Sequence, residues 1–167
     1  VDSGAITADA HGTHVAGTIS AVNNNGYAVC GIAGGTGKGD GVKIMSLQIF
    51  ENDESCYSHQ IAKAFIYAAD NGAVIANNSW GYAPNTYLSD SEYERYDSVL
   101  KDAVEYFESK ARLEGVIEGG VAIFAAGNEA ATAADYPGAY NKYIAVSATS
   151  ADYTASYYTN SGPGASI

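Results

Sequence analysis

The sequence has little positive charge. Eight lysine and arginine residues stand against nineteen aspartate and glutamate residues, which gives a formal net charge of -11 at pH 7. So acidic a chain repels the phosphate backbone of nucleic acids and the anionic surface of lipid bilayers. We therefore expect no nucleic-acid partner.

Long hydrophobic runs are also absent. No stretch approaches the roughly 18 to 20 consecutive apolar residues of a membrane-spanning helix, and the sequence does not open with a basic segment followed by an apolar one. We therefore expect no membrane insertion. Only three prolines occur and 47% of the residues are hydrophobic, which excludes a disordered chain and favours one globular unit with a sizeable core.

Cysteine is scarce. Cys30 and Cys56 are the two cysteines, and their spacing gives neither a CxxC redox motif nor a zinc finger. A single disulfide in an oxidising compartment and two buried thiols both fit this pair, so the sequence leaves the two alternatives open.

The spacing of apolar residues predicts alternating helices and strands. Helical periodicity indicates helices over residues 11–22, 58–70 and 89–114. Apolar runs of strand length indicate buried strands over residues 42–50, 73–77, 120–126 and 143–149. This order predicts an α/β fold with a parallel sheet, in which functional groups gather beyond the carboxyl ends of the strands.

A histidine motif carries the first chemical signal. In the segment DAHGTHVAGT, residues 9–18, His11 opens a predicted helix, and an imidazole titrates near neutral pH, as a general base must. The segment resembles the histidine signature of the subtilase family of serine proteases, and the resemblance implies that His11 is the catalytic base. In a competing interpretation His11 and His14 form a metal-binding pair, but no third ligand stands at a suitable spacing.

A second motif, AAGNE at residues 125–129, directly follows a predicted strand. It resembles the AAGN motif of subtilases, which implies that Asn128 donates a hydrogen bond to the oxyanion of the tetrahedral intermediate. The alternative is that Asn128 only begins a turn.

The motif NSWG, residues 78–81, resembles the subtilase segment that runs beside the bound peptide. The resemblance implies that Ser79, Trp80 and Gly81 bind substrate main chain to main chain, while the alternative for Trp80 is a plain core residue. Two further family segments follow in order, YPGAY with IAV (residues 136–146) and YYTNSG (residues 157–162).

The resemblance implies an α/β fold, a three-layer subtilisin-like parallel sheet flanked by helices, with residues 1–167 as an incomplete catalytic domain. The full-length protein would be a secreted or cell-surface serine endopeptidase that cleaves peptide or protein substrates with a Ser/His/Asp triad. No serine here stands in a GTSMA-like motif, so we expect the nucleophile beyond Ile167 and an inactive isolated fragment. The alternatives are a degenerate subtilase domain that binds peptides as a scaffold, and a doubly wound metal-binding or nucleotide-binding protein.

Two expectations concern groups around the proposed triad. The segment Asp2-Ser3-Gly4 mimics the aspartate signature of subtilases, so Asp2 is one candidate for the triad aspartate. Only eight residues separate Asp2 from His11, however, so we favour a triad aspartate upstream of Val1. The turn of residues 23–26, NNNG, resembles a calcium-binding loop whose amide and backbone oxygens suit a hard cation. We expect no catalytic metal and no other cofactor, and calcium is a candidate for a structural role alone.

Overall fold

The structure is a computed structural model that describes residues 7, 9–50 and 56–166. The chain divides into two compact units, residues 2–56 (the N-terminal unit) and residues 57–167 (the sheet unit). Asp2, the candidate for the triad aspartate, lies outside the described residues.

The N-terminal unit contains helix α1 (Ala10–Ser20), which confirms the helix predicted around the histidine motif. Asp9 caps this helix: its backbone is extended, with a φ of -125°, and its Oδ1 accepts a hydrogen bond from the Gly12 amide at 2.8 Å. An aspartate at this position satisfies one of the amides that the first turn of a helix leaves unpaired.

The strand predicted over residues 42–50 is wrong. Among the described residues this segment joins neither sheet, and the side chains of Val42 and Ile44 are 46% and 44% exposed. An apolar run becomes a strand only where a neighbouring strand supplies the ladder of hydrogen bonds. The apolar pattern alone carries no information about such a neighbour.

The sheet unit is built on a parallel sheet. Its strands follow the order β1-β4-β5-β6, and every neighbouring pair is parallel, as predicted. Its helices are α2 (Ser58–Asp70), α3 (Asp90–Tyr96) and α4 (Ser98–Lys110). Its strands are β1 (Ile75–Asn78), β4 (Val121–Ala125), β5 (Ile144–Val146) and β6 (Ala165–Ser166), with β2 (Arg112–Leu113) and β3 (Ile117–Glu118) forming a separate antiparallel hairpin.

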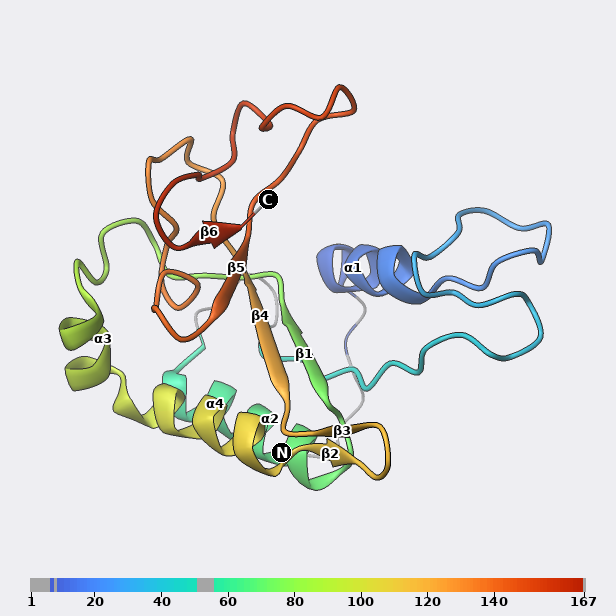
Figure 1. Cartoon of the computed structure of the whole chain (residues 1–167), viewed down its shortest axis with the longest axis horizontal. Helices are drawn as coiled ribbons and strands as arrows, with labels where there is room; N and C mark the ends of the chain where they lie inside the picture. The colour runs from blue at the N-terminus through green and yellow to red at the C-terminus, as the bar shows by residue number, and fades with distance from the viewer. Residues whose placement is uncertain (1–6, 8, 51–55, 167) are drawn as a thin grey trace. The chain divides into compact units, whose positions relative to one another are not determined.

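Helices α2 and α4 pack together against one face of this sheet (Figure 1). The contact is aromatic: the ring of Phe65 on α2 lies 6.0 Å from that of Phe107 on α4 and 6.5 Å from that of Phe124 on β4, measured between centroids. All three side chains are buried. Burying each of them contributes about 1.5–3 kcal/mol to folding.

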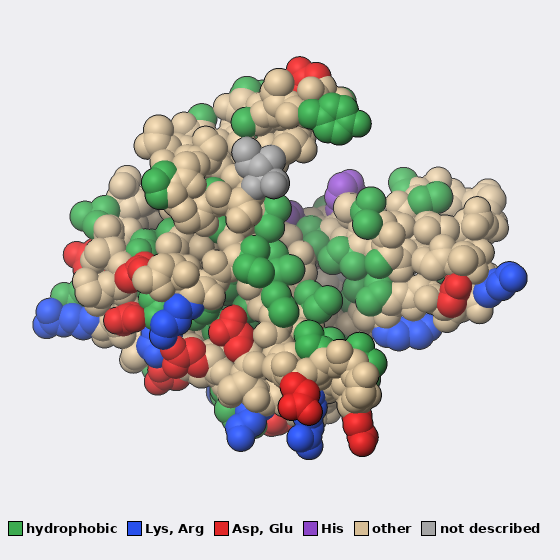
Figure 2. All heavy atoms as spheres, in the orientation of Figure 1, with side chains coloured by type: hydrophobic (Ala, Val, Ile, Leu, Met, Phe, Trp, Pro, Cys, Tyr) green, Lys and Arg blue, Asp and Glu red, His purple; other side chains and the backbone are tan. Residues whose placement is uncertain are grey.

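The opposite face of the sheet exposes apolar side chains. Ile75 on β1 is 61% exposed, and Ile144 and Val146 on β5 are 45% and 46% exposed. Figure 2 shows hydrophobic side chains gathered over these strands. Because side chains alternate between the two faces of a strand, this exposed set is the counterpart of the buried set that meets α2 and α4.

The long helix predicted over residues 89–114 is in fact two helices, α3 and α4, followed by the β2–β3 hairpin. The break falls at Asp97, whose backbone leaves the helical region with φ -130° and ψ 37°. Asp97 is only 3% exposed and accepts a hydrogen bond from the Tyr82 hydroxyl, so a distant contact interrupts the local helical pattern. No described helix is long and apolar enough to cross a membrane.

Candidate active site

Two of the predicted motifs leave the sheet at the same edge. Strands β1 and β4 are parallel neighbours, paired from Ile75 with Val121 to Asn78 with Phe124. Parallel neighbours present their carboxyl ends on one side, which is where α/β proteins assemble their sites. Residues 79–81 follow β1 at this edge, and residues 126–128 follow β4.

Ser79 and Gly81 lie on the segment that continues β1. The Ser79 hydroxyl accepts a hydrogen bond from Asn77 Nδ2 at 3.0 Å. Gly81 is exposed, and the amide of the next residue, Tyr82, donates to the Tyr136 carbonyl at 2.8 Å. This bond holds the end of the segment against the YPGAY motif.

Trp80 is partly a core residue. Its ring meets the ring of Phe124 edge to face, with centroids 5.7 Å apart, and meets the ring of Tyr82 in the same manner at 6.2 Å. The side chain is half-buried. Such packing holds the segment against β4, and it accounts for Trp80 without a bound peptide.

Asn128 is exposed at the turn after β4. Its backbone amide donates to Glu129 Oε2 at 2.7 Å, and among the described residues no hydrogen-bond partner engages its side-chain amide. An exposed N–H donor on a turn held by other residues is the arrangement that an oxyanion hole requires.

His11 lies in the first turn of α1, in the N-terminal unit, and its side chain is exposed. The capping bond from Gly12 to Asp9 defines the start of the helix and so the position of His11 on it. The structure therefore brings Asn128 together with residues 79–81 inside the sheet unit, and it places His11 in the other unit.

A supporting cluster under the Asn128 turn escaped the sequence analysis. The buried side chain of Asn160 donates from Nδ2 to Glu129 Oε2 and to Asp135 Oδ2, both at 2.9 Å. Asn160 belongs to the YYTNSG segment, which the resemblance marked without a role. Nothing local in the sequence indicates that residues 129, 135 and 160 meet, because their contact depends on the return of the chain after β5.

The acidic pair in this cluster is unevenly protonated. Burial, followed by the hydrogen bond and charge of Glu129, raises the pKa of Asp135 to about 6. Burial alone would raise the pKa of Glu129, but hydrogen bonds from Asp135, the Asn128 amide and Asn160 together lower it. The pKa of Asp135 is therefore raised while that of Glu129 is lowered, so Asp135 is the carboxyl group of the pair that takes up a proton first as the pH falls.

The candidate calcium loop, residues 23–26, fits a cation only in part. Asn23 Oδ1 is buried and lacks a hydrogen-bond partner among the described residues, which suits an oxygen ligand. Asn25 Oδ1 already accepts a hydrogen bond from the Tyr27 amide at 2.9 Å. Calcium takes about six to eight oxygens, and the part of the chain that the structure describes holds no group of three or more His, Cys, Asp or Glu side chains suited to a metal.

Of the two cysteines, Cys30 is an exposed free thiol, so the structure shows no disulfide at this residue.

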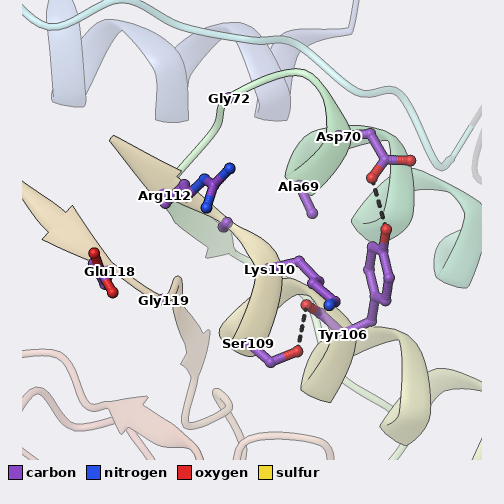
Figure 3. Close-up of a pocket in the computed structure, with 10 residues that line it drawn as sticks. Ala69, Asp70, Gly72, Tyr106, Ser109, Lys110, Arg112, Glu118 and Gly119 are labelled. Atoms are coloured by element: carbon purple, nitrogen blue, oxygen red, sulfur yellow. Dashed lines mark hydrogen bonds between the residues drawn. The ribbon is translucent and has the colours of Figure 1, made fainter. Parts of the chain in front are cut away.

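A hollow of about 570 Å³ lies near the amino ends of β1 and β4 (Figure 3). Gly72 and Gly119, which precede these strands, line it together with charged side chains of both signs. The Tyr106 hydroxyl donates to Asp70 Oδ1 across it at 2.8 Å. None of the predicted site residues is among its described lining residues, so this hollow is not the candidate active site.

The fold is similar to that of solved proteases. The patellamide maturation protease PatA matches with a TM-score of 0.70 and 24% identity, over 93% of this chain and 49% of that chain. A protease from Pseudoalteromonas arctica also matches with a TM-score of 0.70 and 24% identity, over 92% of this chain and 41% of that one. Similarity at this level of identity shows a shared fold and confirms the predicted α/β class.

The comparison of sequences supports the same relationship as the comparison of folds. Thermitase from Thermoactinomyces vulgaris is 32% identical over 161 residues, which cover 96% of this chain and 49% of thermitase. A thermophilic serine proteinase from Bacillus sp. (strain AK1) is 33% identical over 138 residues, 83% of this chain and 28% of the relative. The chain thus spans half or less of these relatives. The model of the subtilase family matches residues 2–167, and we conclude that this chain belongs to the subtilase family of serine proteases.

Proposed function

We propose that the full-length protein is a serine endopeptidase of the subtilisin type. In this proposal His11 is the general base, Asn128 donates to the oxyanion, and Ser79, Trp80 and Gly81 bind the peptide. The observation that carries the proposal is the shared edge of β1 and β4, from which Asn128 and residues 79–81 both leave the sheet.

The reaction follows from these roles. A serine hydroxyl attacks the carbonyl carbon of the substrate while His11 takes its proton, and the carbonyl oxygen becomes an oxyanion that Asn128 stabilises. His11 then gives the proton to the leaving amine, and an acyl-enzyme remains. Water, deprotonated by His11, attacks the ester and restores the serine. The main chain of residues 79–81 holds the peptide alongside β1 during both steps.

The nucleophilic serine is proposed to lie outside residues 1–167, since no serine here stands in a GTSMA-like motif. The triad aspartate is proposed to lie outside them as well, because only eight residues separate Asp2 from His11, and Asp2 is the alternative. Without that nucleophile no acyl-enzyme forms. We therefore expect residues 1–167 alone to be an inactive part of the catalytic domain. Export from the cytoplasm, a protein or peptide substrate, and a structural calcium at residues 23–26 belong to the same proposal.

The second candidate is a peptide-binding scaffold. The half-buried Trp80 packs against Phe124, and this contact favours the scaffold because it forms without any catalytic reaction at the site. Such a protein would bind peptides at the same edge of the sheet and would not cleave them.

Peptidase activity of the full-length protein on a generic chromogenic peptide tests the proposal. We expect His11→Ala to lower kcat on the order of 10⁶-fold, the loss that subtilisin shows for its own catalytic histidine. Asn128→Ala should lower kcat about 10²–10³-fold, again the range of subtilisin, with little change in KM. His59→Ala is the matched control, because His59 is an exposed histidine that stacks on Tyr57 in the sheet unit.

A full-length protein that binds the peptide without cleaving it would establish the scaffold. An active protein whose kcat does not change in His11→Ala would remove His11 from the role of base.

A further inference from the structure

The turn that carries Asn128 is built around a side chain that the proposed mechanism does not use. Asn160 is 0% exposed. Its Oδ1 accepts hydrogen bonds from the backbone amides of Glu129 at 3.0 Å and Ala131 at 2.9 Å. Its own backbone amide donates to the Gly127 carbonyl at 3.0 Å. Asn160 therefore binds the backbone on both sides of Asn128.

The same side chain gathers two carboxyl groups beneath the turn. Asn160 Nδ2 donates to Glu129 Oε2 and to Asp135 Oδ2, each at 2.9 Å. Glu129 Oε2 in turn accepts the Asn128 amide at 2.7 Å. The Asn128 backbone is thus connected to Asn160 through a charged acceptor, and hydrogen bonds to a charged group are the stronger kind.

The proton of the acidic pair completes this network. Glu129 is the charged group that faces Asp135, and each of the two carboxyl groups accepts a hydrogen bond from Asn160 Nδ2. While Asp135 is protonated it can donate to Glu129, and the pair carries one negative charge. Once Asp135 is ionised, two carboxylates face each other over Asn160 Nδ2 and repel.

We propose that Asn160 is a positioning residue for Asn128, and that the carboxyl groups of Glu129 and Asp135, which both accept hydrogen bonds from Asn160 Nδ2, complete the support. This inference rests on the proposed function, since it concerns how the oxyanion donor is held. Asn160 acts through Asn128, so its effect falls on the transition state, where the oxyanion exists, and not on the binding of the substrate. The turn is held most firmly while the pair keeps its proton and loosens when the proton leaves.

Asn160→Asp in the full-length protein tests the positioning role, because it keeps the shape of the side chain, removes its N–H donors and turns attraction to the carboxyl groups of Glu129 and Asp135 into repulsion. We expect kcat to fall about 10–100-fold, as for a displacement of a catalytic group by a fraction of an ångström to 1 Å, with KM within about threefold. In the double variant with Asn128→Ala, the Asn160 substitution should add almost nothing. Losses that multiply in the double variant would overturn the proposal.

Asp135→Asn tests the role of the proton on Asp135, since an asparagine amide permanently mimics the protonated carboxyl. The ratio of kcat in Asp135→Asn to kcat in the wild type is measured from pH 5 to pH 8, so that the pH effects common to both proteins cancel. We expect a ratio near one at pH 5 that rises about threefold or more above pH 6. Asp152→Asn, at an exposed carboxylate whose partner is Thr154, should give a flat ratio. A flat ratio for Asp135→Asn would overturn the role of the proton.

Hydrogen exchange of residues 126–131 separates this proposal from the proposed function, because it needs no activity. Asn160→Asp should speed exchange there relative to α2 in the same molecule. If the full-length protein cleaves no peptide but exchange still rises in Asn160→Asp, the proposed function fails and the support of the turn stands. If exchange in this segment is unchanged, Asn160 does not hold the turn, whatever the activity.

Discussion

At Gly127 the backbone has a φ of +111°, a region that side chains disfavour. A β-carbon at this position would overlap side-chain atoms of Asn160, Asp135 and Glu129. Both effects act on the residue directly before Asn128. A single methyl group here would therefore disturb the backbone and its support at once.

We predict that Gly127→Ala lowers the free energy of unfolding by about 2–4 kcal/mol, the sum of backbone strain and overpacking. Gly115→Ala is the matched control: Gly115 also has a positive φ, +72°, but no atom lies within 4 Å of the β-carbon it would gain. That variant should cost about 1–2 kcal/mol from strain alone. Urea unfolding of both variants measures the difference, and equal costs would show that overlap with the acidic cluster contributes nothing.

The two carboxyl groups of this cluster also set opposite trends of stability with pH. The raised pKa of Asp135, about 6 in the folded state, means that the folded protein holds the proton more tightly than the unfolded chain does. Its contribution is present below the unfolded value of 3.8 and is lost as the pH rises toward about 6. The lowered pKa of Glu129 acts in the other direction, and its contribution is lost as the pH falls below 4.5.

Among the elements, α3 is the least able to stand alone, because seven residues are too few for a stable isolated helix. Tyrosine hydroxyls hold it to the YPGAY segment. Tyr136 donates to Asp90 Oδ1 at 2.7 Å, and Tyr140 donates to Glu94 Oε1 at 2.6 Å. The order of α3 therefore depends on residues more than forty positions away.

We predict that the double variant Tyr136→Phe/Tyr140→Phe increases amide exchange in α3 about tenfold or more, since each lost hydrogen bond is worth about 1 kcal/mol. Exchange in α4 should stay unchanged. Tyr106→Phe serves as the control, because its hydroxyl binds Asp70, outside α3. Equal exchange of α3 in the wild type and the double variant would show that packing of the rings alone holds this helix.

Elements with local signals were predictable from the sequence. Helix α2 begins at Ser58 and ends before Asn71, and β4 and β5 follow their apolar runs. The break between α3 and α4 was not predictable, because it depends on the contact of Asp97 with Tyr82. The strands of the β2–β3 hairpin are too short to show a periodic pattern of apolar residues in the sequence.

In the candidate site too, residues with a local sequence signal were predictable and residues that depend on distant contacts were not. His11 and Asn128 stand in short contiguous motifs, so a resemblance indicates them from the sequence, and their roles stay predictions. Asn160 contacts the Asn128 turn from 31 residues beyond Glu129, a contact that only the folded chain reveals.

At the scale of the whole molecule, the exposed apolar face of the sheet unit dominates the expected behaviour in solution. We predict that the 167-residue chain alone binds the dye ANS and associates at micromolar concentration, because contiguous exposed apolar surface of this kind promotes association. Ile144→Lys should reduce both effects. Leu88→Lys is the control, since Leu88 is 74% exposed and belongs to no strand. ANS fluorescence measures the dye binding, and sedimentation measures the association. Equal values in the two variants would exclude the sheet face as the cause of both effects.

The pairing of β1 with β4 has a consequence for how such a protein can diverge. Hydrogen-bonded strands lie about 4.8 Å apart, so the sheet itself sets the distance between residues 79–81 and the Asn128 turn. The intervening residues 82–120, with α3, α4 and the β2–β3 hairpin, do not set that distance. Insertions and deletions there can accumulate over evolution and reshape the periphery, while residues 79–81 and the Asn128 turn keep the same separation.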